Sequence, residues 1–165
     1  MTKTVKCLQC GGRMVRRREN YKDTSIGLPN VTLLDIEVRR CERCGEQEYA
    51  IPRVLELHRV IAQSVVEKSG RLTGAEIRFL RKYLGWSGAD FARHFGVQPE
   101  TISRWENGKE KMGPIAERLL RLAVVHWAPV ESYAIEKLDT VAQNNKVPLK
   151  LGVKANKNGW ALAKV

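Results

Sequence analysis

The chain has 165 residues, of which 43% are hydrophobic and 28% charged, a composition that excludes an intrinsically disordered chain. Its formal net charge of +11 favours a polyanionic partner, and nucleic acid is the first candidate. The alternative is a basic surface that has no such partner. No stretch is apolar over the ~18 residues of a membrane span, and the N-terminus lacks the apolar segment of a signal peptide. We therefore expect a cytoplasmic protein whose four cysteines are metal ligands rather than disulfides.

The first 51 residues are expected to form a small β domain. Two segments have strand character: Met14 to Arg18, which is short and basic, and Val31 to Val38, which is rich in β-branched residues. Residues 27–30 have the composition of a turn between them, and residues 48–51 offer a further short strand.

All four cysteines lie in this domain, as two Cys-x2-Cys pairs separated by 30 residues: Cys7 with Cys10, and Cys41 with Cys44. Two such turns can surround a tetrahedral ion with four thiolates, and the glycine after each second cysteine permits a tight turn. Four protein ligands leave no open position, so we predict one structural Zn²⁺ per chain. A redox dithiol pair and an iron site of the rubredoxin type are the alternatives.

Helical periodicity begins after the β domain. Residues 52–70 are expected to form a connecting helix, because apolar residues recur on one face between Pro52 and Gly70. At the other end of the chain, residues 141–165 contain several lysines and are assigned to a basic tail, with an added strand as the alternative.

Residues 71–140 are expected to form an all-α domain of five helices. Thr73 can cap the first helix, and Glu76, three residues later, completes a capping box. The later helices are expected to open at Ser87, Pro99, Pro114 and Pro129.

Residues 88–107 carry the pattern of a helix-turn-helix, with small residues, Ala92 and Gly96, at the positions where the two helices approach and turn. The apolar positions that such a pair of helices buries are occupied by Phe91, Phe95, Val97, Ile102 and Trp105. Seven matches at fixed offsets predict a DNA-binding unit, and an unrelated helical hairpin of the same period is the alternative.

Residues 72–127 resemble the XRE-type, lambda-repressor-like helix-turn-helix, most closely in the run from Ile102 to Lys109. A paired-cysteine domain followed by this unit is similar to the MqsA/YgiT-type antitoxin family, over residues 1 to about 140. The resemblance implies an α+β protein of two domains: a small zinc-bound β domain, then an all-α lambda-repressor-like domain of five helices for DNA binding and dimerisation.

In that family the third helix of the domain enters the major groove. Burial of Ile102 and Trp105 leaves five residues of this helix facing outward or at its edges: Gln98, Glu100, Thr101, Ser103 and Arg104. Arg104 stands where the family has its base-reading arginine and can bind guanine O6 and N7. Glu100 stands where the family has asparagine, so a different operator sequence is expected. Lys109 and Lys111 are expected to bind phosphate, with a solvated loop as the alternative.

The resemblance implies a transcriptional repressor that is the antitoxin of a type II toxin–antitoxin pair, that autoregulates its operon and binds its toxin through the zinc domain. The strand Val31 to Val38 is expected to offer a free edge to the toxin, unless its apolar residues form the domain's own small core: Leu33, Leu34, Ile36 and Val38. A homodimer on a palindromic operator is expected to form through apolar residues of the last helices: Leu119, Leu122, Val125, Trp127 and Tyr133.

Two other functions fit the same residues less closely. One is a stand-alone zinc-containing transcription regulator without a toxin partner, and the other is a rubredoxin-like iron redox protein. The sequence has no nucleotide-binding loop and no Ser-His-Asp set, so we do not expect an enzyme.

Overall fold

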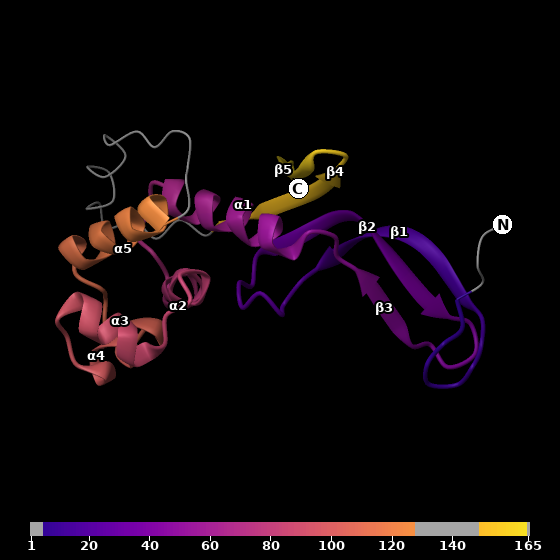
Figure 1. Ribbon diagram of the computed structural model, residues 1–165, viewed down its shortest axis with the longest axis horizontal. Coiled ribbons are helices and arrows are strands. Elements are labelled where there is room, and N and C mark those ends of the chain that lie inside the picture. The colour runs from indigo at the N-terminus through magenta and orange to yellow at the C-terminus, as the bar shows by residue number, and fades with distance from the viewer. Residues whose placement is uncertain (1–4, 128–148, 165) are drawn as a thin grey trace.

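A computed structural model of the chain describes residues 5–127 and 149–164. The described part is elongated, with a β-sheet at one end, a group of helices at the other and helix α1 between them (Figure 1). The elements in chain order are β1 (Met14–Lys22), β2 (Val31–Cys41), β3 (Gln47–Ala50), α1 (Val54–Glu67), α2 (Gly74–Tyr83), α3 (Gly88–Phe95), α4 (Pro99–Glu106), α5 (Pro114–Trp127), β4 (Leu151–Asn156) and β5 (Gly159–Ala163). The predicted α+β layout of two domains is confirmed; the helix expected to open at Pro129 lies outside the described residues.

Strand β2 is the centre of the sheet. On one side it pairs antiparallel with β1, from Cys41 opposite Met14 to Thr32 opposite Lys22. On the other side, residues 37–40 pair antiparallel with β3 and residues 31–34 pair in parallel with β4. Between these two partners Asp35 takes a positive φ of 54°, and the register with β1 shifts there. This irregularity is a β-bulge, which lets one strand change neighbours along its length.

The expectation that Val31 to Val38 offers a free edge is wrong. Neighbouring strands already occupy most of both sides of β2. The side chains of Leu33, Ile36 and Val38 are buried, and Leu34 is half-buried, so these residues form the sheet's own core. The alternation of apolar residues predicts only that one face of the strand is buried. A central strand and an edge strand both have such a face, so the pattern does not distinguish them.

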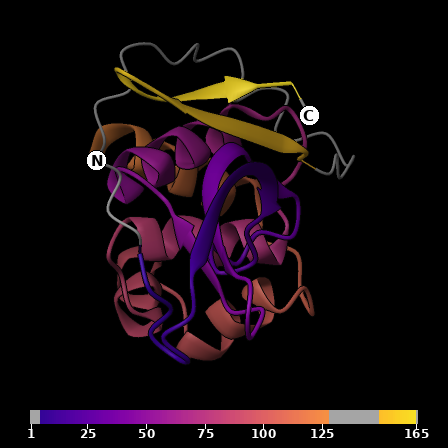
Figure 2. The same ribbon diagram turned by 90° about the vertical axis from the view of Figure 1, so that its right-hand side faces the viewer.

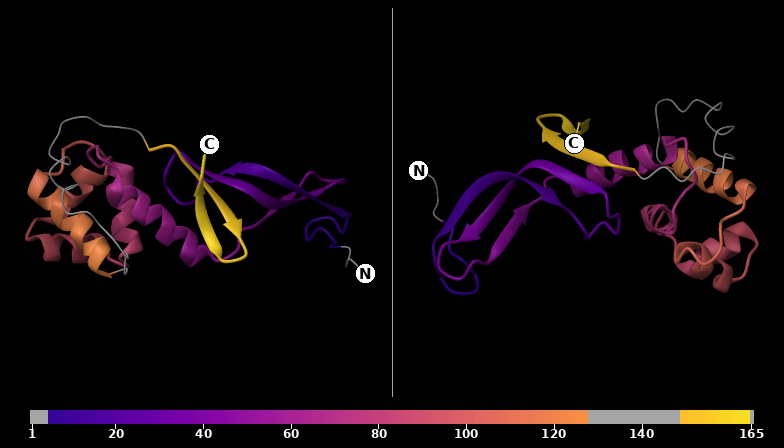
Figure 3. Two further views of the ribbon diagram at one scale, coloured as in Figure 1. Left: turned by 90° about the horizontal axis from the view of Figure 1, so that it is seen from above. Right: turned by 180° about the vertical axis from the view of Figure 1, so that it is seen from behind.

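The assignment of residues 141–165 to a tail is also wrong for residues 151–163, which form the antiparallel hairpin β4–β5. Leu151 and Val153 are buried, because β4 extends the sheet beside β2. Strand β5 contacts α1, so the hairpin bridges the sheet and the connecting helix (Figures 2 and 3). The alternative of an added strand is therefore the correct one. The described lysines of this segment are exposed, whereas Leu151, Val153 and Trp160 are buried in the core.

Helix α1 joins the two domains through a shared core. Its buried residues include Leu57, Ile61 and Val65, as the predicted apolar stripe required. One cluster of buried apolar side chains runs from the sheet through α1 to α2–α5. In the described part of the chain, no helix combines the length and the apolar character needed to cross a membrane.

A buried arginine fixes the end of α1 to the helical domain. The fully buried guanidinium of Arg121, on α5, donates to the backbone carbonyls of Val66, Lys68 and Gly70, each at 2.7 Å, and pairs with Glu117 at 3.0 Å. A helix leaves its last carbonyls without intrahelical partners, and the arginine satisfies them here. The connection between α1 and α2 is therefore held by directed bonds rather than by packing alone.

Candidate metal centre and nucleic-acid interface

The four cysteines lie on two similar turns. In the first, the N–H of Cys7 donates to the carbonyl of Gly12 at 2.8 Å, and in the second the N–H of Cys41 donates to the carbonyl of Glu46 at 2.8 Å. Gly11 and Gly45 have φ values of 70° and 77°, which a residue with a Cβ rarely adopts. The second turn follows directly from β2, so the sheet positions Cys41 and Cys44 opposite the first pair.

The four sulfurs form a compact cluster that fits a metal ion. All lie within 4.8 Å of one another, with Cys7 Sγ 3.6 Å from Cys44 Sγ and Cys10 Sγ 3.5 Å from Cys41 Sγ. Tetrahedral zinc–thiolate bonds of about 2.3 Å place the sulfurs about 3.8 Å apart. The cluster therefore has the size of a four-thiolate site, and the prediction that these cysteines are arranged to bind a metal ion is confirmed.

Backbone N–H groups favour the charged form of one cysteine of the cluster. Bonds from the N–H groups of Cys44 and Arg43 lower the pKa of the Cys41 thiol from its ordinary value of 9.0 to about 6. A bond from the N–H of Glu46 lowers the pKa of Cys44, but the neighbouring Cys10 sulfur and burial outweigh it and raise that pKa to about 12. Thiolates are the form that binds metal, so Cys41 is the cysteine that is prepared for ligation before an ion arrives. Gly12 lies against the cluster, since a Cβ at this position would meet the sulfurs of Cys41 and Cys10 at 3.1 and 3.2 Å.

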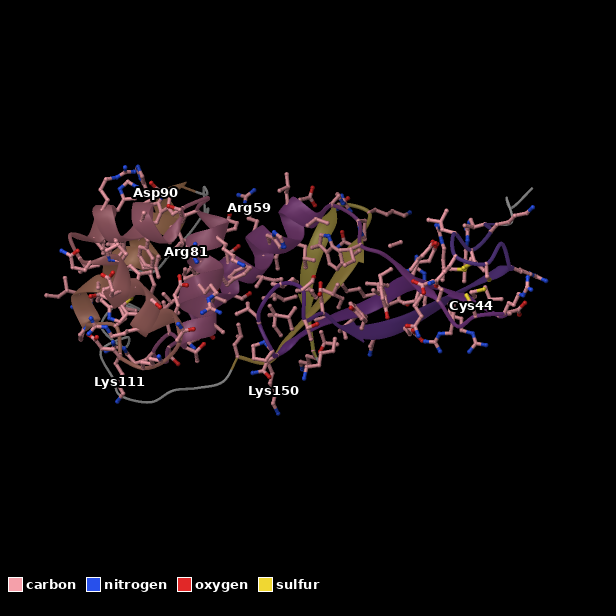
Figure 4. All side chains as sticks on the ribbon, turned by 90° about the horizontal axis from the view of Figure 1, so that it is seen from below. Cys44, Arg59, Arg81, Asp90, Lys111 and Lys150 are labelled. Atoms are coloured by element: carbon pink, nitrogen blue, oxygen red, sulfur yellow. The ribbon has the colours of Figure 1, made fainter. Side chains whose placement is uncertain are left out.

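At the opposite end of the molecule, local signals fix the two helices α3 and α4 (Figure 4). Ser87 caps α3 in a capping box with Asp90, and Gly96 ends the helix in the left-handed conformation, with a φ of 63°. Pro99 then opens α4, and Gln98 precedes it without a capping bond from its side chain. The turn between the helices is therefore set by residues 96–99.

Buried residues hold α4 in place. Ile102 and Trp105 are 2% and 5% exposed, and the Trp105 ring packs edge-on against Phe91 of α3. The half-buried Glu106 receives two bonds from the guanidinium of Arg81 on α2, at 2.5 and 3.1 Å. Sequence reasoning missed this pair. The sequence shows an arginine on the expected first helix and an acid next to Trp105. Neither feature indicates that these two residues meet.

The predicted DNA-contacting residues lie on or beside one surface of α4. Thr101 is half-buried. The other six are exposed: Gln98, Glu100, Ser103, Arg104, Lys109 and Lys111. Arg104 forms an ion pair with Glu110 at 3.4 Å. The backbone carbonyl of Arg104 accepts a hydrogen bond of 2.9 Å from the N–H of Lys109. The loop after α4 thus folds back next to the arginine, which brings the predicted base reader and phosphate binder together.

The metal centre and this surface are far apart. Cys44 lies at one end of the long axis, whereas Arg81, Asp90 and Lys111 lie at the other (Figure 4). The metal cluster therefore has no direct part in the surface that α4 presents. Its separate small core, formed by Cys7, Met14 and Cys41, agrees with a role in holding the end of the sheet together.

Comparison with known families bears on the helical part of the chain. Residues 77–125 match the family model described as helix-turn-helix, a span that runs from α2 into α5 and contains the whole of α3 and α4. No curated protein matches the chain. The matched family consists of DNA-binding regulators rather than enzymes. Residues 77–125 therefore form a helix-turn-helix domain of the XRE type, the DNA-binding part of a transcription regulator.

Proposed function

We propose that the protein is a sequence-specific transcriptional repressor that inserts α4 into the major groove of its operator. The observation that carries this proposal is the exposure of one side of α4 in a helix whose other side is buried by Ile102 and Trp105. Arg104 is on the open side, with its side chain 54% exposed, and is the residue best suited to read a guanine. Its partner Glu110 is 46% exposed, and a guanine edge replaces that carboxylate when DNA binds.

We further propose that two copies bind a palindromic operator. Support comes from α5, where Ile115, Leu119 and Leu122 are 82%, 45% and 43% exposed and recur at helical spacing. An exposed apolar stripe of this kind suits an isologous contact between two copies. Val125 is half-buried at the end of the same helix, and Tyr133 lies outside the described residues.

The metal in the cysteine cluster is proposed to be zinc in a structural role. Four thiolates leave no open position for chemistry, and the cluster belongs to the packing at the end of the sheet. The iron alternative predicts a red protein and the zinc assignment a colourless one, so absorbance and elemental analysis of the purified protein distinguish them.

The role of antitoxin is the finer proposal, and it rests on the resemblance of the domain order. A toxin partner cannot use β2, so we propose the outer edge of β1 beyond Met14, because β2 is the one strand that pairs with β1 within the described residues and the N–H of Met14 already donates to Val5. An open strand edge can accept a strand from a partner. If the neighbouring gene product is not toxic or does not co-purify with the chain, the stand-alone regulator replaces the antitoxin.

The DNA proposal is tested by selection from a pool of random duplexes with the full-length, metal-loaded protein. We expect enrichment of a palindrome whose half-sites lie about one helical turn apart. Light scattering of the complex is expected to show two chains per duplex. Failure to enrich any sequence, with the protein folded, would contradict the proposal.

A further inference from the structure

A pocket of about 360 Å³ lies where the loop between β1 and β2 meets α1 and α2. In Figure 1 this loop extends from the sheet towards α2, beneath α1. Apolar side chains from all three parts line it, among them Ile26, Leu57 and Phe79. Both domains therefore contribute to its walls. Its volume falls in the range of about 300–1,000 Å³ that small-molecule sites occupy.

A buried carboxylate stands in the wall of this pocket. Asp23 is only 2% exposed, and its Oδ1 accepts bonds from the N–H and Oγ of Ser25, at 2.8 and 2.6 Å. Within the described residues its other oxygen, Oδ2, accepts no hydrogen bond and no cation pairs with it. The charge acts on its surroundings, since burial and the negative charge of Asp23 raise the pKa of Tyr21.

The second oxygen of this carboxylate is accessible from the pocket. Oδ2 has no hydrogen-bond partner, yet it is not among the enclosed unpaired atoms of the described residues, so a molecule in the pocket can reach it. A cation is the partner that a carboxylate between apolar walls favours most. The pocket offers two basic side chains of its own, Lys82 and His58. Lys82 is exposed at the rim, and the ring of His58 packs edge-on against Phe79, with 6.2 Å between ring centroids. Neither forms an ion pair with Asp23 in the described structure.

We propose that this pocket binds a small apolar amine, with the ammonium group on Oδ2 of Asp23 and the apolar body against Leu57 and Phe79. The apolar walls exclude a strongly hydrated ion, and the carboxylate selects a cation over a neutral or acidic molecule of the same shape. The ligand contacts the β1–β2 loop and also α2, which belongs to the DNA-binding domain. The site is distinct from the DNA surface and from the cysteine cluster.

The test measures binding of benzylamine to the full-length, metal-loaded protein by calorimetry and by the shift in Tm. Benzyl alcohol and benzoate have nearly the same shape and serve as the neutral and anionic comparisons. We expect benzylamine at millimolar concentration to raise Tm and the other two compounds to leave it unchanged. An equal effect of benzyl alcohol, or no effect of benzylamine, overturns the proposal.

Two variants separate the carboxylate from the cavity. Asp23→Asn keeps an oxygen for Ser25 and is expected to weaken benzylamine binding about 30-fold or more. Glu48→Gln, which removes one negative charge from β3 outside the pocket, is expected to bind as the unchanged protein does. If Asp23→Asn fails to fold, Val54→Trp at the exposed rim fills the pocket without touching the carboxylate and is expected to abolish binding. Undiminished binding in folded Asp23→Asn or in Val54→Trp overturns the proposal.

Discussion

The indole Nε1 of Trp160, in β5, donates a hydrogen bond of 2.5 Å to the backbone carbonyl of Pro52. The two residues are 108 positions apart in the chain. Pro52 stands two residues before α1, so the bond fixes the last hairpin to the start of the connecting helix. Trp160 is 7% exposed and belongs to the main core cluster. The hairpin is therefore a structural part of the joint between the two domains.

Replacing Trp160 should destabilise the whole protein. Trp160→Phe loses the bond to Pro52 and is expected to lower the free energy of unfolding by about 1–3 kcal/mol, whereas Trp160→Ala should lower it by about 3–5 kcal/mol. Leu162→Ala on the same hairpin is the control, since Leu162 is 59% exposed and should change stability by less than about 0.5 kcal/mol. Urea unfolding measures all three, and equal stability of Trp160→Ala and Leu162→Ala would show that the hairpin does not contribute.

Removal of the metal should unfold the end of the sheet. Cys10→Ser is expected to lose the bound ion and the order of both turns, because metal binding supplies folding free energy to so small a core. Elemental analysis gives the metal content, and hydrogen exchange shows which segment opens. Retention of one metal ion per chain in Cys10→Ser would contradict the four-cysteine site.

Metal retention should also depend on pH with a definite sign. The fold lowers the pKa of Cys41 from 9.0 to about 6, so its stabilisation of the thiolate is complete above 9.0 and is lost as pH falls through 6. Protons then compete with the metal for the sulfurs. We therefore expect release of the ion below about pH 6, measured with a chromogenic chelator. Release that does not change between neutral and acidic pH would argue against thiolate ligation.

Arg104 and Lys109 should affect DNA binding in different ways. Arg104→Ala is expected to cost about 1–3 kcal/mol on the operator and to relax the preference at one base pair. Lys109→Ala should weaken all sequences alike and reduce the salt slope by about 1. Fluorescence anisotropy on operator and random duplexes separates the two effects. Equal weakening of both duplexes by Arg104→Ala would exclude base reading by this residue.

The ion pair between Arg104 and Glu110 allows a second variant at the same surface. Glu110→Gln removes the carboxylate that holds the guanidinium in the free protein, at 3.4 Å. Because an exposed pair of this kind contributes little stability, Tm should change little. Operator affinity should rise or stay the same, since the arginine no longer has to leave a charged partner. A clear loss of operator affinity would indicate that Glu110 itself contacts the DNA.

Gly74, the first residue of α2, should not tolerate a side chain. A Cβ there would collide with the backbone carbonyls of Glu106 and Trp105 at the end of α4. Gly74→Ala is therefore expected to cost about 1–3 kcal/mol and to displace α4 from its DNA-binding position. Gly88→Ala is the matched control, because Gly88 opens α3 with free space around it and alanine is the better helix former. If both variants unfold at the same temperature, the close approach of α2 and α4 is unimportant.

The sequence by itself determined the features that depend on local spacing. The cysteine pairs could be recognised because each turn is built by neighbouring residues, whose two-residue spacing brings both sulfurs to one side. The helices could be placed from Thr73, Ser87 and Pro99, because caps and first-turn prolines act within one helical turn. Burial of Ile102 and Trp105 then fixed which side of α4 is open.

Only the tertiary structure decided which distant segments meet. The pairing of β4 with β2 joins residues about 120 positions apart in a parallel register, and no local signal specifies the partner of such a strand. The same holds for the hydrogen bond from Trp160 to Pro52, for the bonds from Arg121 to the end of α1 and for the burial of Asp23. Each is a polar or amphipathic side chain whose environment is created by residues far along the chain, so its partners follow from packing and not from sequence pattern.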